Sequence, residues 1–250
     1  MTLKEAAIII DNLTKEFEDV TAVDGLSLTV EKAELFGLLG PNGAGKTTTI
    51  NVLSGLSEPT SGSISVGGYD VWKEPHKVKQ LIGVCPQDTA VFLYLTGREN
   101  VELFGNLHAM PKEKLKKNAD GLLTKMGLLE DAKRQVGKYS GGMRRRINLI
   151  MALVHDPEIA FLDEPTVGMD PQSRRAVWDF IRELRKRDKT VVLTTHYMEE
   201  AEELCDRVGI IDYGKLIALG SPAQLKAKFE AKNLEEVFIQ LTGRRIREEL

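Results

Sequence analysis

The chain has 250 residues, of which 42% are hydrophobic and 28% are charged, and 34 basic and 37 acidic side chains leave a formal net charge of −3. This balance is typical of a globular protein with a sizeable core, and it argues against a strongly basic nucleic-acid binder. The two cysteines, Cys85 and Cys205, exclude a disulfide scaffold, and no apolar stretch reaches the roughly 18–20 residues that span a bilayer.

The first 87 residues alternate between strand-like and turn-like segments. The apolar and alternating runs predict two hairpins, over residues 6–30 and residues 61–71. Between them, the apolar run at residues 35–39 stops at the breaker cluster Gly40-Pro41-Asn42-Gly43, which predicts a buried central strand. A helix is expected to follow over residues 45–56.

Helical spacing replaces the strand-like runs from about residue 88 to residue 156, as at Val101, Phe104 and Leu107. We interpret this stretch as a helical lobe inserted into a sheet domain. After it, strand and helix alternate, which indicates a parallel sheet. The expected strands are residues 159–162, 191–194 and 208–211, and the expected helices are residues 171–186 and 198–204.

The segments together predict an α/β fold in a single domain. Its core comprises residues 1–87 and 157–220 and includes an antiparallel β subdomain near the N-terminus. The helical lobe covers residues 88–156, and a charged helical tail follows at residues 221–250.

A glycine-rich pattern, G-x-x-x-x-G-K-[ST], lies between the predicted central strand and the following helix. Glycines let backbone N–H groups converge on phosphate oxygens, and the helix N-terminus adds its dipole. Lys46 offers a charge to the β and γ phosphates, and the Thr47 hydroxyl can bind Mg²⁺. We therefore predict that this segment is a phosphate cradle that binds a nucleotide. Its residues are Gly40, Pro41, Asn42, Gly43, Ala44, Gly45, Lys46, Thr47 and Thr48.

An acidic pair, Asp163-Glu164, ends the apolar strand expected at residues 159–162. Ligands of open α/β sheets bind beyond the carboxyl ends of the strands, so Asp163 should face the metal. Because adjacent strand residues point to opposite sides, Glu164 can be presented to a water molecule instead. We expect Glu164 to be the general base; without the phosphate cradle, a solvated acidic pair would be an equal alternative.

The segment Tyr139-Ser140-Gly141-Gly142-Met143 opens a predicted helix, and at this point nearly the whole chain resembles the ATP-binding subunit of an ABC transporter. The family signature is usually written LSGGQ. The YSGGM form resembles the signature found in the branch that exports drugs and polysaccharides. The resemblance implies a P-loop NTPase (RecA-like) core, ATP and Mg²⁺ as cofactors, and ATP hydrolysis that drives export.

Three further site residues follow from the resemblance. Phe17 stands where the family stacks an aromatic ring, usually Tyr, on adenine; a core aromatic at the sheet edge is the alternative. Gln87 resembles the glutamine that contacts Mg²⁺ or water, although a lone glutamine would more often be a surface residue. His196 matches the histidine that contacts the γ-phosphate and orients the catalytic water. The implied metal ligands are Thr47, Gln87 and Asp163.

A second predicted anion site consists of backbone N–H groups at a helix N-terminus, in the segment Ser140, Gly141 and Gly142. Because the cradle already holds one nucleotide, a second site is useful if it closes over the γ-phosphate held by another subunit. The resemblance implies the same head-to-tail sandwich dimer, with itself or with a paralogous subunit. Met143 then completes the signature, and Asp170 communicates across the dimer; taken alone, Asp170 would pass for a helix cap.

Two runs of basic residues and one apolar cluster have simpler structural explanations. Arg144-Arg145-Arg146 and Arg185-Lys186-Arg187 are read as solvated helix faces or favourable C-terminal charge rather than nucleic-acid contacts. The apolar cluster at residues 91–95 fits either core packing or a surface that receives a coupling helix of a membrane subunit.

The predicted function is that of an ATPase that powers a separately encoded integral-membrane permease. The first residues lack a signal-peptide layout, so we expect a cytoplasmic protein, held at the inner face of the cell membrane through the permease, with no nucleic-acid partner. The alternative is a soluble single-cassette ABC ATPase that serves an assembly or repair process.

Overall fold

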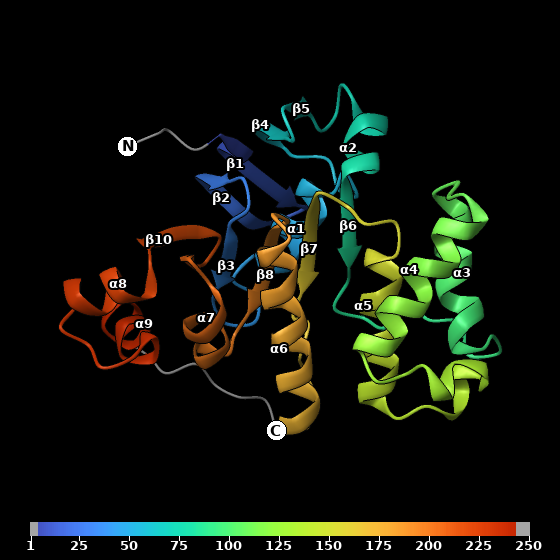
Figure 1. Cartoon of the computed structure of the whole chain (residues 1–250). Coiled ribbons are helices and arrows are strands. Elements are labelled where there is room, and N and C mark those ends of the chain that lie inside the picture. The colour runs from blue at the N-terminus through green and yellow to red at the C-terminus, as the bar shows by residue number, and fades with distance from the viewer. Residues whose placement is uncertain (1–4, 244–250) are drawn as a thin grey trace.

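The computed structural model describes residues 5–243, whose strands form two sheets (Figure 1). The smaller sheet is antiparallel and has the order β2-β1-β4-β5. Its long hairpin confirms the first predicted hairpin, and its shorter strands confirm the second. The strands are β1 (Ala6–Phe17), β2 (Val20–Glu31), β4 (Ser61–Val66) and β5 (Tyr69–Asp70).

The larger sheet has the order β10-β9-β3-β8-β7-β6 and is parallel except for its edge strand β10. Its central strands therefore place their carboxyl ends along one edge, where ligands of such sheets bind. The strands are β3 (Leu35–Leu39), β6 (Ile82–Cys85), β7 (Ile159–Asp163), β8 (Thr190–Thr195), β9 (Arg207–Asp212) and β10 (Lys215–Gly220).

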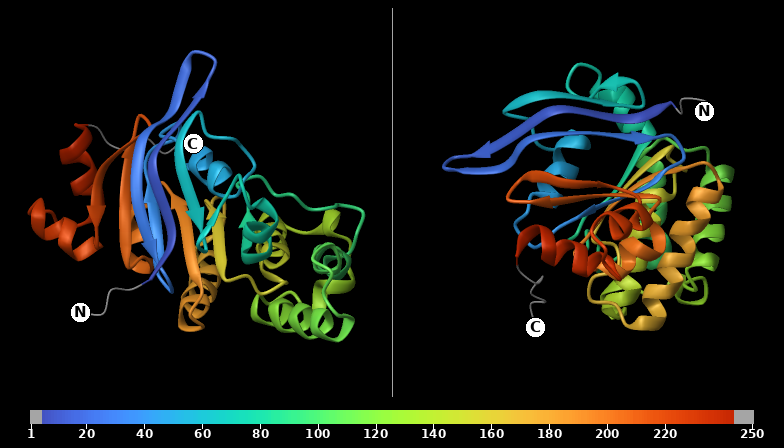
Figure 2. Two further views of the ribbon diagram at one scale, coloured as in Figure 1. Left: turned by 90° about the horizontal axis from the view of Figure 1, so that it is seen from above. Right: turned by 90° about the vertical axis from the view of Figure 1, so that its left-hand side faces the viewer.

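Strand β3 shows why the sheet is buried on both faces. Phe36 and Leu38 pack into the hydrophobic core between the two sheets, whereas Leu35 and Leu39 pack into a second core on the opposite face. Helix α1 (Lys46–Leu53) contacts β2 of the small sheet and β7 of the large one, so it lies between the sheets (Figure 2). The segment that joins β3 to α1 is therefore held in place from both sides.

Helices cover the other face of the large sheet and form a lobe beside it. Helix α6 (Pro171–Lys186) packs on β8, and α7 (Met198–Leu204) packs on β3 and β8. In the lobe, α3 (Gly97–Leu107), α4 (Lys112–Lys125) and α5 (Gly141–Leu153) pack on one another, and α5 also contacts β6 and β7. Figure 2 shows the lobe projecting from one side of the sheet.

Several elements were not expected from the sequence. They are β6, β10 and the helix α2 (Pro75–Leu81). The predicted tail contains α8 (Pro222–Lys228) and α9 (Leu234–Thr242), and its residues 244–250 lie outside the described residues. Cys85 and Cys205 are buried and free. Within residues 5–243, no helix combines the length and the apolar character needed to cross a membrane.

Candidate active site

The predicted phosphate cradle is the loop between β3 and α1. Gly45 caps α1 with a φ of 102°, and a Cβ there would lie 2.3 Å from the carbonyl oxygen of Ala22, so only glycine fits. Gly43 also has a positive φ, of 80°, but a Cβ there would meet no atom within 4 Å. The loop thus combines a tightly fixed end with an open surface that an anion can approach.

Lys46 lies inside this loop and is 4% exposed. Its Nζ donates hydrogen bonds to the carbonyl oxygens of Gly40 at 2.8 Å and Pro41 at 3.1 Å. It also lies 3.3 Å from Oε1 of Glu164. Burial lowers the pKa of the Lys46 ammonium, and the Glu164 carboxylate opposes that shift. The amino group of Lys46 is therefore held at the centre of the cradle.

Three predicted site residues converge on the carboxylate of Glu164. Besides Lys46, Nε2 of Gln87 donates to Oε2 at 3.5 Å, and Nδ1 of His196 lies 3.1 Å from Oε1. Burial alone would raise the pKa of the Glu164 carboxyl, but His196 and Lys46 outweigh it and the pKa is lowered. The carboxylate is thus ionised at neutral pH, the form that a general base requires.

The backbone of Glu164 is bent out of the strand. Its φ is 47°, in the left-handed region that a non-glycine residue rarely adopts. Its N–H donates to Oγ1 of Thr194 at 2.9 Å and to the Thr194 carbonyl oxygen at 3.2 Å. Strained backbone of this kind is retained where surrounding contacts over-determine it, commonly in active sites.

Asp163, the last residue of β7, accepts a hydrogen bond from the Thr194 hydroxyl and is 2% exposed. Together with the Thr47 hydroxyl and the Gln87 amide oxygen it would offer oxygen donors only, the type that Mg²⁺ prefers. No group of three or more His, Cys, Asp or Glu side chains within residues 5–243 could hold a metal ion by itself. This donor set fits Mg²⁺ that is bound jointly by protein and phosphate oxygens.

The signature segment caps helix α5. Oγ of Ser140 accepts a hydrogen bond from the Met143 N–H at 3.2 Å. Ser140 and Gly141 are exposed, and a Cβ on Gly141 would meet no atom within 4 Å. The N-terminus of this 13-residue helix is therefore open at the surface of the lobe. Its free N–H groups can donate hydrogen bonds to an anion presented from outside the chain.

The structure decides between alternatives for two other residues. Phe17, at the end of β1, is 48% exposed, with the Lys15 ammonium 4.5 Å from its ring centre, so the core alternative is wrong. Asp170 caps α6 and accepts a hydrogen bond from the Ser173 N–H at 3.0 Å. Hydrogen bonding by Ser173 lowers the pKa of the Asp170 carboxyl. Asp170 is therefore a helix cap in this structure, and its role in communication across the dimer stays a prediction.

The interpretation of Arg145 as part of a solvated face is wrong, because this side chain is only 4% exposed. Its neighbours Arg144 and Arg146 are half-buried. Helical spacing carried the missing signal: residue 145 shares a helix face with Asn148, Leu149 and Ala152, all of which are buried. Three successive arginines concealed the fact that only the middle one points inward.

Sequence reasoning also missed Glu200 on α7, which is 1% exposed. Its Oε1 accepts hydrogen bonds from Oγ1 of Thr166 at 2.7 Å and from Nε1 of Trp178 at 2.8 Å. Thr166 lies in the loop between the catalytic pair and Asp170. Glu200 therefore fastens this loop to the elements that follow His196. Burial raises the pKa of the Glu200 carboxyl, and the Thr166 hydrogen bond opposes the shift.

The Glu200→Gln variant is expected to gain stability relative to the wild type as the pH rises above 4.5, the ordinary pKa of this carboxyl. Below that pH, Glu200 is protonated in the folded and the unfolded chain, so the difference in unfolding free energy is constant. Above it, only the unfolded chain ionises, and the wild type loses up to about 1.4 kcal/mol per pH unit until the raised pKa is passed.

Urea unfolding of both proteins over a pH series measures this difference. Glu199→Gln, at the exposed neighbour on the same helix, is the control and should show no such trend. A pH-independent difference for Glu200→Gln would show that Glu200 is ionised in the folded chain.

The chain is similar to known proteins in sequence. A family model described as ABC transporter matches residues 23–167. The chain is 46% identical to the linearmycin resistance ATP-binding protein LnrL of Bacillus subtilis, over 93% of this chain and 73% of that one. It is also 46% identical to the Nod factor export ATP-binding protein I of Burkholderia lata, over 88% and 72%.

A solved structure is similar as well. It is the dimeric structure of a post-hydrolysis state of an ATP-binding cassette, bound to ADP and Pi. The TM-score is 0.79 at 26% identity, over 86% of this chain and 98% of that chain. The P-loop NTPase fold expected from the sequence is confirmed by this likeness.

Proposed function

Because the chain belongs to the ABC transporter family and is one of its ATP-hydrolysing subunits, we propose that it drives export through a separate membrane permease. Support comes from two relatives, one named for linearmycin resistance and one for Nod factor export. The observation that carries the proposed chemistry is the convergence of Lys46, Gln87 and His196 on Glu164.

ATP would be held by the loop of residues 40–48, with the phosphates on its backbone N–H groups and on Lys46. The exposed ring of Phe17 would stack on adenine. Thr47, Gln87 and Asp163 would hold Mg²⁺, which when bound neutralises charge on the β and γ phosphates. The oxygen-only character of these three side chains supports that assignment.

Hydrolysis requires a water molecule aligned with the γ-phosphate. Glu164 would accept a proton from this water as it attacks, because its carboxylate is ionised and lies 3.3 Å from Lys46 Nζ, the group that would contact the β and γ phosphates. His196, 3.1 Å from the same carboxylate, would orient the water and contact the γ-phosphate. A movement of Gln87 when ATP binds would be transmitted to the loop that follows it.

Two copies of the chain, or this chain and a paralogue, would form a head-to-tail dimer. The open N-terminus of α5 supports this arrangement, since Ser140, Gly141, Gly142 and Met143 can cover a γ-phosphate only from outside. Asp170 would communicate across the dimer. Loss of the γ-phosphate removes a charge that both subunits hold, so hydrolysis opens the dimer and produces motion.

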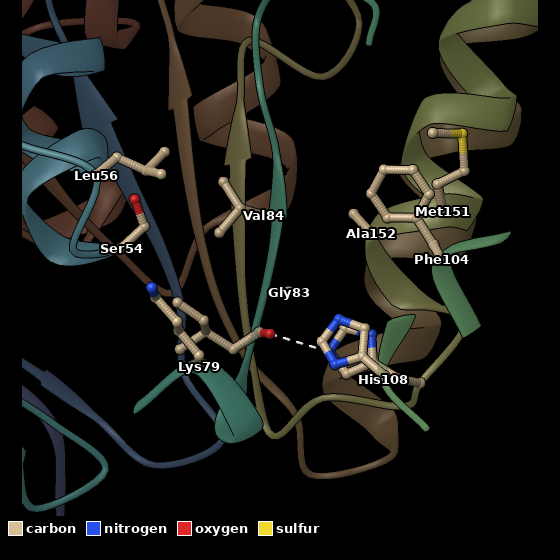
Figure 3. Close-up of a pocket in the computed structure, with 11 residues that line it drawn as sticks. Ser54, Leu56, Lys79, Gly83, Val84, Phe104, His108, Met151 and Ala152 are labelled. Atoms are coloured by element: carbon tan, nitrogen blue, oxygen red, sulfur yellow. Dashed lines mark hydrogen bonds between the residues drawn. The ribbon is translucent and has the colours of Figure 1, made fainter. Parts of the chain in front are cut away.

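The permease would dock on the side where the lobe meets the sheet domain. Phe92, Leu93 and Tyr94 are 51%, 46% and 89% exposed, so core packing does not explain this part of the apolar cluster. An apolar pocket of about 290 Å³ lies between β6 and the lobe, lined by Val84, Phe104 and Met151 among others (Figure 3). Exposed apolar surface of this kind is typical of interaction sites.

This arrangement would place the chain at the inner face of the cell membrane, with residues 88–156 as the lobe that connects signature and permease. The net charge of −3 gives no electrostatic support for a nucleic-acid partner.

A tagged chain is expected to recover one polytopic membrane protein in near-stoichiometric amount from detergent-solubilised native membranes. Tyr94→Asp should reduce that recovery about tenfold or more without loss of ATP binding, because it places a charge in the apolar surface. Leu219→Asp, at an exposed position on edge strand β10, is the control. Recovery of soluble proteins only would overturn the export function and favour the assembly or repair alternative.

A further inference from the structure

We propose that Arg145 is a positioning residue that joins helix α5 to the glutamine loop, the segment that contains Pro86 and Gln87, and to the backbone of the catalytic residue Glu164. This inference rests on the proposed ATPase site. The side chain leaves α5 and enters the junction between the lobe and the large sheet. At 4% exposed, it is among the few charged residues in the buried interior of residues 5–243.

The guanidinium of Arg145 donates to five backbone carbonyl oxygens. Nη1 bonds to Pro86 at 2.7 Å and to Gln87 at 2.5 Å. Nη2 bonds to Asp163 at 2.5 Å and to Glu164 at 2.7 Å, and Nε bonds to Pro165 at 3.2 Å. One rigid planar group thus connects two chain segments that are more than 70 residues apart in the sequence.

This geometry matches what only arginine can supply. Its planar fork presents five N–H donors in fixed directions, whereas a lysine ammonium presents three donors from one point. A buried charge is tolerated when dipoles satisfy its donors, and here carbonyl oxygens do so. The neighbouring Asn148, on the same helix face, adds a hydrogen bond to Pro86 at 3.3 Å and accepts one from the Ala90 N–H at 3.3 Å.

The position of the bonds gives Arg145 a role in the reaction. Glu164 is held in its left-handed conformation by Thr194, which binds its N–H, and by Arg145, which binds its carbonyl oxygen. Gln87 is held by the same guanidinium. A displacement of α5, the helix that begins at the signature, would therefore move the glutamine loop and the general base together.

The experiment compares ATP binding with turnover in the purified full chain. Arg145→Lys and Arg145→Gln should bind ATP with a Kd within about threefold of wild type, because Lys46 and its loop are untouched. Their kcat should fall about 10- to 100-fold, because the catalytic carboxylate is displaced by a fraction of an ångström. KM for ATP should change little, which distinguishes lost positioning from lost binding.

Chemical rescue supplies a readout that a merely structural role would not give. In Arg145→Ala, millimolar guanidinium should restore part of the lost kcat, since it can re-form the bonds to the same carbonyl oxygens. Urea at equal concentration should not. Arg98→Ala, which removes an ion pair with Asp120 that ties α3 to α4 inside the lobe, is the control for general loosening of the lobe.

Three outcomes would overturn the proposal: wild-type kcat in Arg145→Lys and Arg145→Gln, parallel loss of ATP affinity and kcat, or an equal fall of kcat in Arg98→Ala. Glu164→Gln, assayed alongside, tests the proposed function separately. If that variant hydrolyses ATP normally, the general-base assignment fails, whatever Arg145 does.

Discussion

Replacement of Lys46 by alanine is expected to reduce the affinity for ATP on the order of 100-fold or more. The ammonium is buried, points to the carbonyl oxygens of Gly40 and Pro41, and so lies at the centre of the phosphate cradle. Charge-assisted hydrogen bonds contribute about 1.5–3 kcal/mol each, and every 1.4 kcal/mol is about tenfold in affinity. Loss of contacts to two phosphates thus removes most binding at millimolar ATP.

Titration calorimetry with ATP and Mg²⁺ measures this effect. Lys73→Ala is the matched control, because Lys73 is an exposed lysine that pairs with Asp70 on the small-sheet side of the molecule. Far-ultraviolet circular dichroism shows whether the Lys46→Ala chain is folded, and Lys46→Gln serves if the alanine variant is not. Undiminished ATP affinity in a folded variant would refute the cradle assignment.

The Glu164→Gln variant is expected to bind ATP normally but to hydrolyse it about 10²- to 10⁴-fold more slowly, or roughly 3–5 kcal/mol of barrier. Glutamine keeps the shape of the side chain, so contacts with Gln87 and His196 can persist, but it cannot accept the proton of the attacking water. Because the γ-phosphate then stays in place, the ATP-bound dimer should accumulate.

Steady-state ATPase assays and sedimentation velocity with and without ATP test both parts. Glu158→Gln is the control: Glu158 is an exposed carboxylate that immediately precedes the opposite end of β7. A Glu164→Gln chain that stays monomeric at saturating ATP would count against the shared-site mechanism. One that turns over ATP at the wild-type rate would remove Glu164 from the role of base.

Local patterns were sufficient for the elements that present this chemistry. The apolar run of β3, the breaker cluster and the lysine that starts α1 are contiguous, so their order predicts a strand, an anion loop and a helix. Helices α6 and α7 begin and end at the predicted residues. Strand β6 was missed because its four residues, Ile82–Cys85, include a glycine and carry no alternation.

The residue types that follow β3 and end β7 determined by themselves that this chain carries a phosphate cradle and an acidic pair, since glycine, lysine and carboxylate chemistry is local. Only the tertiary structure decided which groups meet. Gln87, Lys46 and His196 reach Glu164 from the segments that follow three different strands, because parallel strands align their carboxyl ends.

Arg145 is a clearer example of a feature that only the tertiary structure determines. Within the sequence it is the middle of three arginines, and charge alone favours solvent for all of them. Packing of α5 against β6 and β7 turns one of the three inward, where carbonyl oxygens from two distant segments satisfy it. Burial and long-range hydrogen bonding depend on the whole fold, and no local pattern of charge encodes them.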